Sequence, residues 1–167
     1  MRTPSSENPG AEKMMEPSFE KLLAHLAANR IEFLLVGGLA VALNGYVRLT
    51  EDVDILIDTN PENIARFIEA MAEYGEGHGG SFAPEDFDEI PGALRLIEET
   101  EQSQLDIFTV MDGLTYRDFI SDAESYELGN HTIRYASRAM LIRFKSSSVR
   151  EKDQIDVFAL QRLNDEG

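Results

Sequence analysis

The stretch VGGLAVALNGYVRLTEDVDILI, residues 36–57, decides the fold of this chain. Residues 31–36 form an apolar run that is too short for a helix and is typical of a buried strand. Gly37 and Gly38 end that run, and the apolar residues 39–44 then have the length and composition of a short helix. The segment therefore predicts a strand that turns tightly into a helix.

The second half of the stretch predicts a strand with two acidic residues on one face. Val53, Ile55 and Ile57 recur at the period of a strand. Asp52 and Asp54 are two residues apart, so both side chains project from the same face, roughly 7 Å apart. At an effective dielectric of about 20, their repulsion is on the order of 2 kcal/mol. A divalent cation with oxygen ligands offsets such repulsion; the alternative is an exposed face with two solvated acids.

A third acidic residue, Asp106, lies within the apolar run 105–108. An acid in a buried strand costs stability unless it is paired or binds a metal. Asp106 is therefore a candidate third ligand. The alternative is an acid at a strand edge that is hydrogen-bonded to a neighbouring loop.

The rest of the chain predicts more helices and strands. Helices are expected at residues 18–29 with Ser18 as the N-cap, from Asn60 to Met71, at residues 116–123 and from residue 137 onward. Strands are expected at residues 94–98 and 105–110, joined by a turn over 99–104, and in a tight hairpin of residues 126–128 and 132–135. The glycine-rich residues 75–80 are expected to form a loop. This order favours an α+β or mixed α/β domain with a central mixed sheet flanked by helices.

Composition excludes several classes of protein. The chain has 167 residues and no cysteine, so disulfide scaffolds, thiol catalysis and zinc–thiolate sites are ruled out. No apolar run approaches the ~20 residues of a membrane span, and residues 1–17 lack the apolar core of a secretory signal. We therefore expect a cytoplasmic protein without a membrane partner. Residues 1–16 are expected to form a mobile tail, and residues 17–167 a single domain.

Charge is large and unevenly distributed. The net charge is −16, which repels a nucleic-acid backbone on average. Residues 51–130 hold 21 acidic and three basic residues, whereas residues 131–152 hold six basic residues and one acidic residue. One interpretation is a solvated acidic surface with a basic element docked on it. The other is an anionic substrate that bridges a metal site and a basic helix.

Taken together, these motifs resemble the nucleotidyltransferase superfamily, which has the polymerase-beta-like fold. Its members carry a Gly-Gly or Gly-Ser turn into a helix, an Asp-x-Asp on the next strand and a third acid on a later strand, like Val36-Gly37-Gly38, Asp52-Val53-Asp54 and Asp106 here. The run from Arg48 to Asp54 resembles small bacterial AbiEii/AbiGii-type proteins in particular. Their closing Lys…Arg-x-Lys-Asp-x-x-Asp motif is similar to Lys145 followed by residues 150–156. The resemblance covers roughly residues 30–163.

The resemblance implies Mg²⁺-dependent transfer of a nucleoside monophosphate from a nucleoside triphosphate (NTP) to a hydroxyl acceptor. Two Mg²⁺ ions would be held by Asp52 and Asp54, with Asp106 sharing one of them. Gly37 and Gly38 would cradle phosphate oxygens at the start of the following helix.

The remaining motif residues would serve the nucleotide and its phosphates. Lys145 and Lys152 would add point charges, and Arg150 belongs to the same closing motif. Asp153 would be a helper carboxylate or an ion-pair partner of Lys152 or Arg138. Arg48 and Thr50 would fix the loop that precedes the acids.

The acceptor stays open among RNA, protein and a small molecule. Larger members of the superfamily carry an additional domain that grips the substrate, and no such domain is expected in this chain. The alternative function is therefore a non-catalytic nucleotidyltransferase-like module that binds a protein partner in a toxin–antitoxin or other paired system. The basic segment at residues 134–152 suits a protein partner as well as a nucleotide.

Overall fold

A computed structural model describes residues 15–47, 49–146 and 150–166 of the chain. Most of the expected N-terminal tail, and Arg48, lie outside these ranges. Within the expected tail, Met15 is buried, and its sulfur accepts a hydrogen bond from the Tyr126 hydroxyl at 3.4 Å. The packed core therefore includes a residue that precedes the first expected helix.

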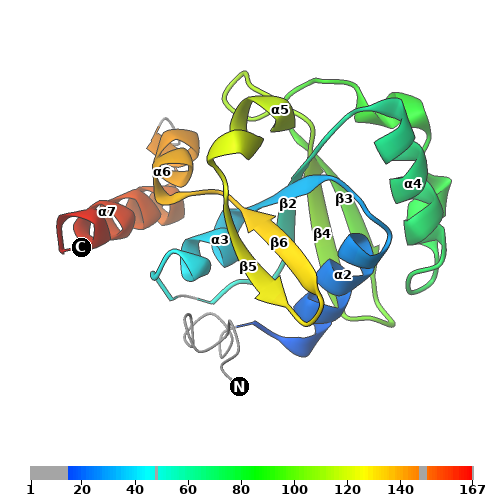
Figure 1. The fold of residues 1–167 in the computed structure, drawn as a ribbon, viewed down its shortest axis with the longest axis horizontal. Coiled ribbons are helices and arrows are strands. Elements are labelled where there is room, and N and C mark those ends of the chain that lie inside the picture. Colours follow the sequence, from blue (N-terminus) through cyan, green and yellow to red (C-terminus); the bar gives the residue numbers. More distant parts are fainter. Residues whose placement is uncertain (1–14, 48, 147–149, 167) are drawn as a thin grey trace.

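A six-stranded mixed sheet forms the centre of the fold (Figure 1). Its strands are β1 (Phe33–Val36), β2 (Val53–Ile57), β3 (Ala93–Glu98), β4 (Ser103–Phe108), β5 (Glu124–Leu128) and β6 (His131–Tyr135). They are arranged in the order β3-β4-β2-β1-β6-β5. The pairs β2–β4 and β1–β6 are parallel, whereas β1–β2, β3–β4 and β5–β6 are antiparallel. This confirms the predicted mixed sheet.

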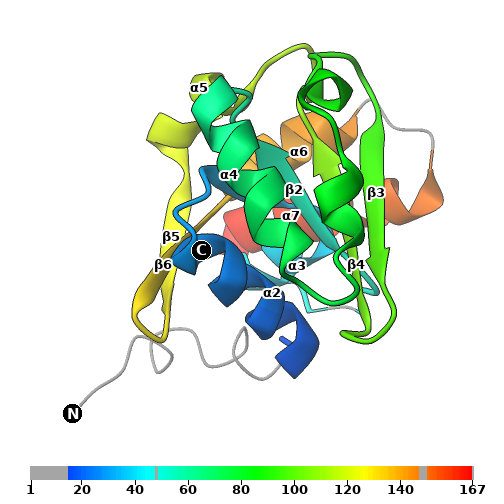
Figure 2. The ribbon, with the colours of Figure 1, turned by 90° about the vertical axis from the view of Figure 1, so that its right-hand side faces the viewer.

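Helices flank this sheet, as predicted. They are α2 (Pro17–Ala28), α3 (Gly37–Leu43), α4 (Pro61–Ala72), α5 (Tyr116–Phe119), α6 (Arg138–Ser146) and α7 (Glu151–Glu166). Helices α2 and α4 lie on one side of the sheet, and α6 and α7 lie on the other (Figure 2). None of the described helices is long and apolar enough to cross a membrane.

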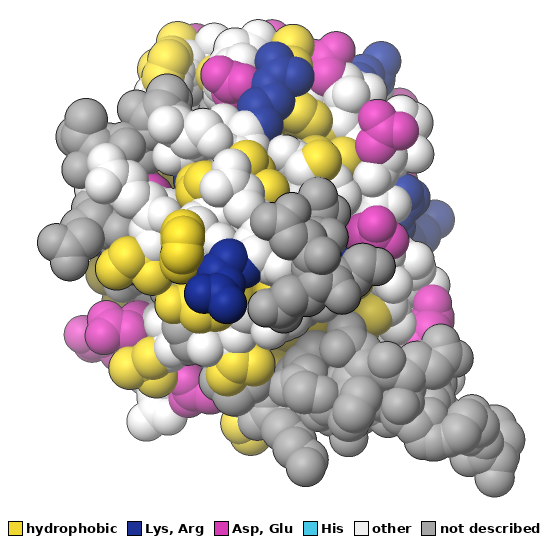
Figure 3. Space-filling model, turned by 90° about the vertical axis from the view of Figure 1, so that its left-hand side faces the viewer, with side chains coloured by type: hydrophobic (Ala, Val, Ile, Leu, Met, Phe, Trp, Pro, Cys, Tyr) yellow, Lys and Arg dark blue, Asp and Glu magenta, His cyan; other side chains and the backbone are white. Residues whose placement is uncertain are grey.

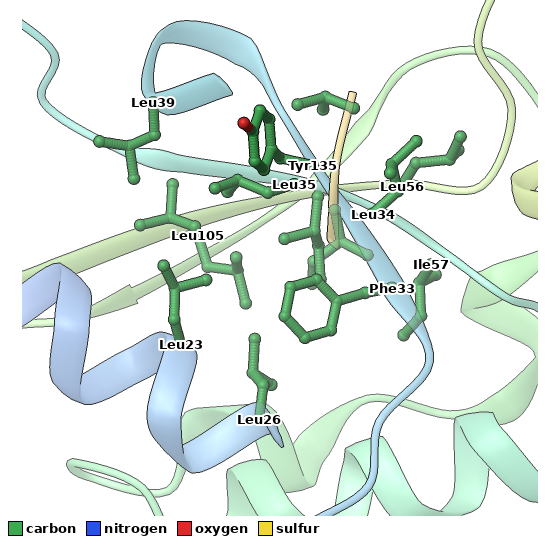
Figure 4. Close-up of a cluster of buried hydrophobic side chains, with 14 of the residues drawn as sticks. Leu23, Leu26, Phe33, Leu34, Leu35, Leu39, Leu56, Ile57, Leu105 and Tyr135 are labelled. Atoms are coloured by element: carbon green, nitrogen blue, oxygen red, sulfur yellow. The ribbon is translucent and has the colours of Figure 1, made fainter. Parts of the chain in front are cut away.

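The hydrophobic core is built around β1, whose four residues are all buried. Leu23 and Leu26 of α2 point toward Phe33 and Leu105 (Figure 4). Because β1 lies between β2 and β6 and is covered on both faces, its sequence is continuously apolar instead of alternating. The core thus fixes the position of the turn that follows Val36.

Several local predictions about helices differ from the structure. Ser18 was expected to be the N-cap of the first helix, but α2 begins one residue earlier, at Pro17, with Glu16 as the N-cap. Proline is favoured at the first helical position, because its fixed φ suits the helix and its missing N–H would be unpaired there. The glycine-rich segment is not entirely a loop, since His78–Ser81 form a 3-10 helix. The helix expected at residues 116–123 is only α5 followed by a 3-10 turn at Ile120–Asp122.

Candidate active site

Three carboxylates meet at one place on the sheet. Each of Asp52, Asp54 and Asp106 offers an oxygen, and these oxygens lie within 4.8 Å of one another. Asp54 of β2 is in direct register with Asp106 of the parallel neighbour β4, so the two side chains project side by side from one face. Asp52 precedes β2 by one residue. The convergence predicted for these residues is therefore observed, and we refer to them as the triad.

Burial and mutual repulsion disfavour the ionised forms of Asp52 and Asp54. Burial, followed by the charges of Asp52 and Asp106, raises the pKa of Asp54 to about 7. The pKa of Asp52 is also raised, by burial first and then by Asp106. Three oxygen-donor carboxylates that repel one another suit a hard divalent cation, which would replace repulsion by attraction.

Two neighbours of the triad were not predicted. The side-chain amide of Gln104 donates to Asp52 Oδ2 at 3.2 Å. Arg95 donates to both Asp106 oxygens, from Nε at 2.9 Å and from Nη2 at 3.3 Å. The Arg95 contact depends on the β3–β4 register, in which Arg95 faces Asp106, and the Gln104 contact depends on the β2–β4 register, in which Val53 faces Leu105. The expected turn at residues 99–104 was too long, because β4 already begins at Ser103.

The turn after Val36 is shaped by its contact with Asp54. Gly37 has a φ of +71°, in the left-handed region that glycine adopts without strain. A Cβ atom at this position would overlap the Asp54 carboxylate. Val36 and Asp54 are partners across β1 and β2, which brings the turn against the triad. Gly37 is therefore needed for the close approach of the backbone to this carboxylate.

A hollow of about 210 Å³ lies beside the triad. It is lined by Val36, Gly37, Gly38, Thr50, Asp52, Asp54, Phe108, Met111, Leu141, Phe144, Lys145, Arg150, Lys152 and Asp153. Except for Asp106 and the undescribed Arg48, every site residue predicted from the sequence lines it. The Thr50 hydroxyl donates to the backbone oxygen of Asp52 at 3.3 Å, in keeping with a role in fixing the loop before the acids.

The closing motif forms a buried ion-pair cluster between α6 and α7. Lys145 Nζ lies 2.9 Å from Asp153 Oδ1 and 3.1 Å from Asp156 Oδ2. The Lys145 side chain is 10% exposed and that of Asp156 is 0% exposed. Arg150 donates to both Asp153 oxygens, at 2.9 and 3.1 Å. Asp153 thus pairs with Lys145 and Arg150, two partners that the sequence did not suggest.

Lys152 is an exposed cation near the triad. It lines the hollow, and its charge counteracts the rise in the pKa of both Asp52 and Asp54. The charge of Lys145 also counteracts the rise in the pKa of Asp54, but it is matched by two buried carboxylates. Lys152 is therefore the better placed of the two lysines to attract an anion into the hollow.

A second group of potential metal ligands, Glu76, His78 and Glu98, has a structural explanation. The buried carboxylate of Glu98 accepts hydrogen bonds from the backbone N–H of Glu76 at 2.8 Å and of His78 at 3.0 Å. These bonds anchor the glycine-rich turn to the end of β3. They account for the ordered 3-10 helix where the sequence predicted a loop.

Comparison with solved structures gives the class of fold. The structure of the lincosamide antibiotic adenylyltransferase LnuA, with lincomycin bound, matches with a TM-score of 0.61 and 20% identity, over 90% of this chain and 98% of that one. An antigenic nucleotidyltransferase-like protein from Paracoccidioides brasiliensis matches with a TM-score of 0.48 and 18% identity, over 86% of this chain and 73% of that one. No family model matches the chain. No curated protein matches it either.

The fold is therefore nucleotidyltransferase-like, as the sequence motifs predicted. At 20% identity the likeness to LnuA establishes the fold and not the activity. The finer placement among AbiEii/AbiGii-type proteins stays a prediction.

Replacing Gly37 by Ala is expected to damage the triad as well as the turn. The left-handed backbone costs about 1–2 kcal/mol with any side chain, and the new Cβ displaces the Asp54 carboxylate. Gly129→Ala is a matched control, because Gly129 has a φ of +61° and open space around it. Urea unfolding should show a lower free energy of unfolding for both variants, whereas the affinity for Mn²⁺ should fall only in Gly37→Ala. Undiminished Mn²⁺ binding by Gly37→Ala would show that the glycine serves the turn alone.

Replacing Lys145 by Met should destabilise the protein strongly. The change leaves Asp153 and Asp156 buried without the ammonium that both contact. Removing one partner of a buried ion pair costs about 3–5 kcal/mol. Arg150→Met is the control, since the 66% exposed Arg150 side chain also pairs with Asp153 but should contribute about 1 kcal/mol or less. Denaturant midpoints measure both effects, and equal midpoints for the two variants would contradict a structural role for Lys145.

The stability of the metal-free protein should depend on the protonation of Asp54. Its pKa of about 7 lies above the ordinary value of 3.8, so between these limits the folded state binds a proton that the unfolded state lacks. The contribution of Asp54 to stability therefore falls as the pH rises through this window, by roughly 4 kcal/mol at most. Asparagine does not ionise, so Asp54→Asn does not lose this stability as the pH rises. At about pH 8 the variant should therefore unfold at a higher urea concentration than the unmodified protein. A difference between the two unfolding curves that does not vary with pH would refute the shifted pKa.

Proposed function

We propose that the protein is a metal-dependent nucleotidyltransferase that moves a nucleoside monophosphate from an NTP to a hydroxyl group. The observation that carries the proposal is the convergence of Asp52, Asp54 and Asp106 beside a hollow with a basic side. Phosphoryl transfer needs little beyond positioning and charge neutralisation, which is what such a site offers. The nucleotidyltransferase-like fold supports the same conclusion.

The triad fits divalent cations by its chemistry. Its donors are three carboxylates, the ligands that Mg²⁺ and Mn²⁺ prefer, and burial and repulsion disfavour the metal-free ionised forms of Asp52 and Asp54. In the proposal, Asp52 and Asp54 hold the ions and Asp106 shares one of them. Bound there, two Mg²⁺ ions would supply activation of the acceptor hydroxyl and neutralisation of the triphosphate.

The side chains of the hollow divide into two kinds. Lys152 and Arg150 provide positive charge for the triphosphate, and Gly37 and Gly38 line the part of the hollow that we assign to phosphate oxygens. The side chains of Phe108, Met111, Leu141 and Phe144 provide an apolar wall. A nucleotide has the same division, with charged phosphates at one end and an apolar base face at the other. We infer that the hollow holds the NTP.

The proposed reaction is a single displacement at the α-phosphorus of the NTP. The acceptor oxygen forms a bond to this phosphorus, and the bond to the bridging oxygen of the leaving pyrophosphate breaks. The acceptor hydroxyl passes its proton to a triad carboxylate, the basic group next to the reacting atoms. Lys152 balances charge that develops on the pyrophosphate.

A small molecule is the acceptor class that we propose. The net charge of −16 opposes binding of RNA as an acceptor. The matching structure with a TM-score of 0.61 is described as a lincosamide antibiotic adenylyltransferase, and this chain covers 98% of it. That protein is therefore matched over almost its whole length by this chain, and its structure holds a small-molecule ligand.

Incubation with labelled NTPs tests the proposal. Each of the four labelled NTPs is supplied with Mg²⁺ and, separately, with total RNA, cell protein or a panel of hydroxyl-bearing small molecules that includes lincosamides and aminoglycosides. We expect label in a small-molecule fraction, and a loss of ~10²-fold or more in Asp54→Asn. Asp58→Asn, at the far end of the same strand, is the matched control and should keep the activity. Label in RNA or protein would correct the acceptor class.

The alternative, a non-catalytic module in a paired system, is favoured by one observation. Large hydrophobic side chains are exposed at Val47, Leu49, Ile155 and Phe158, and hydrophobic side chains are visible on the molecular face shown in Figure 3. A thermal-shift scan with each MgNTP separates the two functions when it is combined with the labelling. At an NTP concentration of 100 times the Kd, binding stabilises the protein by about 2.7 kcal/mol in either case. An enzyme also transfers the label to an acceptor, whereas a non-catalytic module does not.

A further inference from the structure

Arg95 reaches the triad from the edge of the sheet. It lies on β3, the outermost strand on its side, directly opposite Asp106 of β4. Asp106 in turn is in register with Asp54 of β2. The three residues therefore form a row across three neighbouring strands, with the guanidinium at its outer end.

The ion pair occupies both oxygens of Asp106. Nε of Arg95 lies 2.9 Å from Oδ1, and Nη2 lies 3.3 Å from Oδ2. Such two-pronged, charge-assisted bonds are stronger than those between neutral groups. A cation that Asp106 binds would have to share these oxygens, and its positive charge repels the guanidinium. The guanidinium and the cation therefore compete for Asp106.

The two partners differ in how easily they can separate. The Asp106 side chain is 9% exposed, whereas the Arg95 side chain is 60% exposed. Arg95 can turn into water without leaving a buried cation behind, but Asp106 stays in place on its strand. The charge of Arg95 also reaches beyond Asp106, since it counteracts the rise in the pKa of Asp52.

We propose that Arg95 is a built-in competitor of the divalent cation: it pairs with Asp106 in the metal-free protein and gives up at least one carboxylate oxygen when the cation binds. This inference rests on the proposed function only in taking the triad as the cation site. Arg95 stabilises the metal-free triad by lowering its net negative charge, so it lowers the affinity for the cation. It is a positioning residue, because its contact is with Asp106.

Mn²⁺ binding to the full chain tests this role without relying on activity. Electron paramagnetic resonance measures free Mn²⁺ during a titration at about pH 8, above the pKa of Asp54. Arg95→Ala removes the competitor, and Arg95→Lys keeps the charge but not the planar two-pronged contact. Arg117→Ala is the matched control, since Arg117 is 69% exposed and pairs with an acid outside the triad, Asp58, at 3.6 Å. Asp54→Asn removes a ligand.

We expect Arg95→Ala to bind Mn²⁺ about tenfold more tightly than the unmodified protein, as loss of a charge-assisted hydrogen bond implies. Arg95→Lys should lie between the two, and Arg117→Ala should match the unmodified protein. Equal or weaker binding by Arg95→Ala, with binding intact in the unmodified protein and lost in Asp54→Asn, would overturn the competitor role and leave the cation site standing. Absence of Mn²⁺ binding in every variant would overturn both the competitor and the proposed function.

Discussion

Repulsion among three carboxylates is the constraint on which the site depends. Asp52, Asp54 and Asp106 lie within 4.8 Å of one another on a sheet whose other residues are mostly apolar. A fold selected for stability alone would not gather like charges at its centre, since their ionised forms oppose burial. The protein sustains this arrangement because its large core stabilises the sheet independently. Local instability of this kind is typical of a site that is completed by a ligand.

Strand pairing holds the mutually repelling carboxylates in a defined geometry. Asp54 and Asp106 come from strands separated by about fifty residues of sequence, and parallel pairing holds them side by side. Gly37 lets the turn after β1 lie directly against Asp54, because the Asp54 carboxylate occupies the space that a Cβ atom at position 37 would need. The ion pairs of Lys145 attach α7 to α6 and thereby hold Lys152 near the triad. The strand pairing, the Gly37 turn and the Lys145 ion pairs come from different parts of the chain.

The sequence predicted the elements of the site that depend on local pattern. The strand of Asp54, the glycine turn before it and the helix capped by Asn60 all follow from short-range rules, and the structure has them. The role of Arg95 could not be predicted, because it depends on a hairpin register that changes with the length of one turn. The pairing of Lys145 with Asp156 depends on how two helices pack, which charge patterns along one helix do not specify.

The close contact between the Gly37 turn and the Asp54 carboxylate leaves a substrate fewer directions from which to approach the triad. An in-line displacement requires the incoming oxygen and the departing pyrophosphate to lie on opposite sides of phosphorus. If the pyrophosphate occupies the hollow beside α6 and α7, the acceptor must arrive over β4 and β3, where Arg95 and Ile97 are exposed at the edge of the sheet. An edge strand bounds that route on one side only. Acceptors would then be selected by whether their hydroxyl group can reach the phosphorus, and hardly by their overall size. The in-line displacement would also invert the configuration at phosphorus.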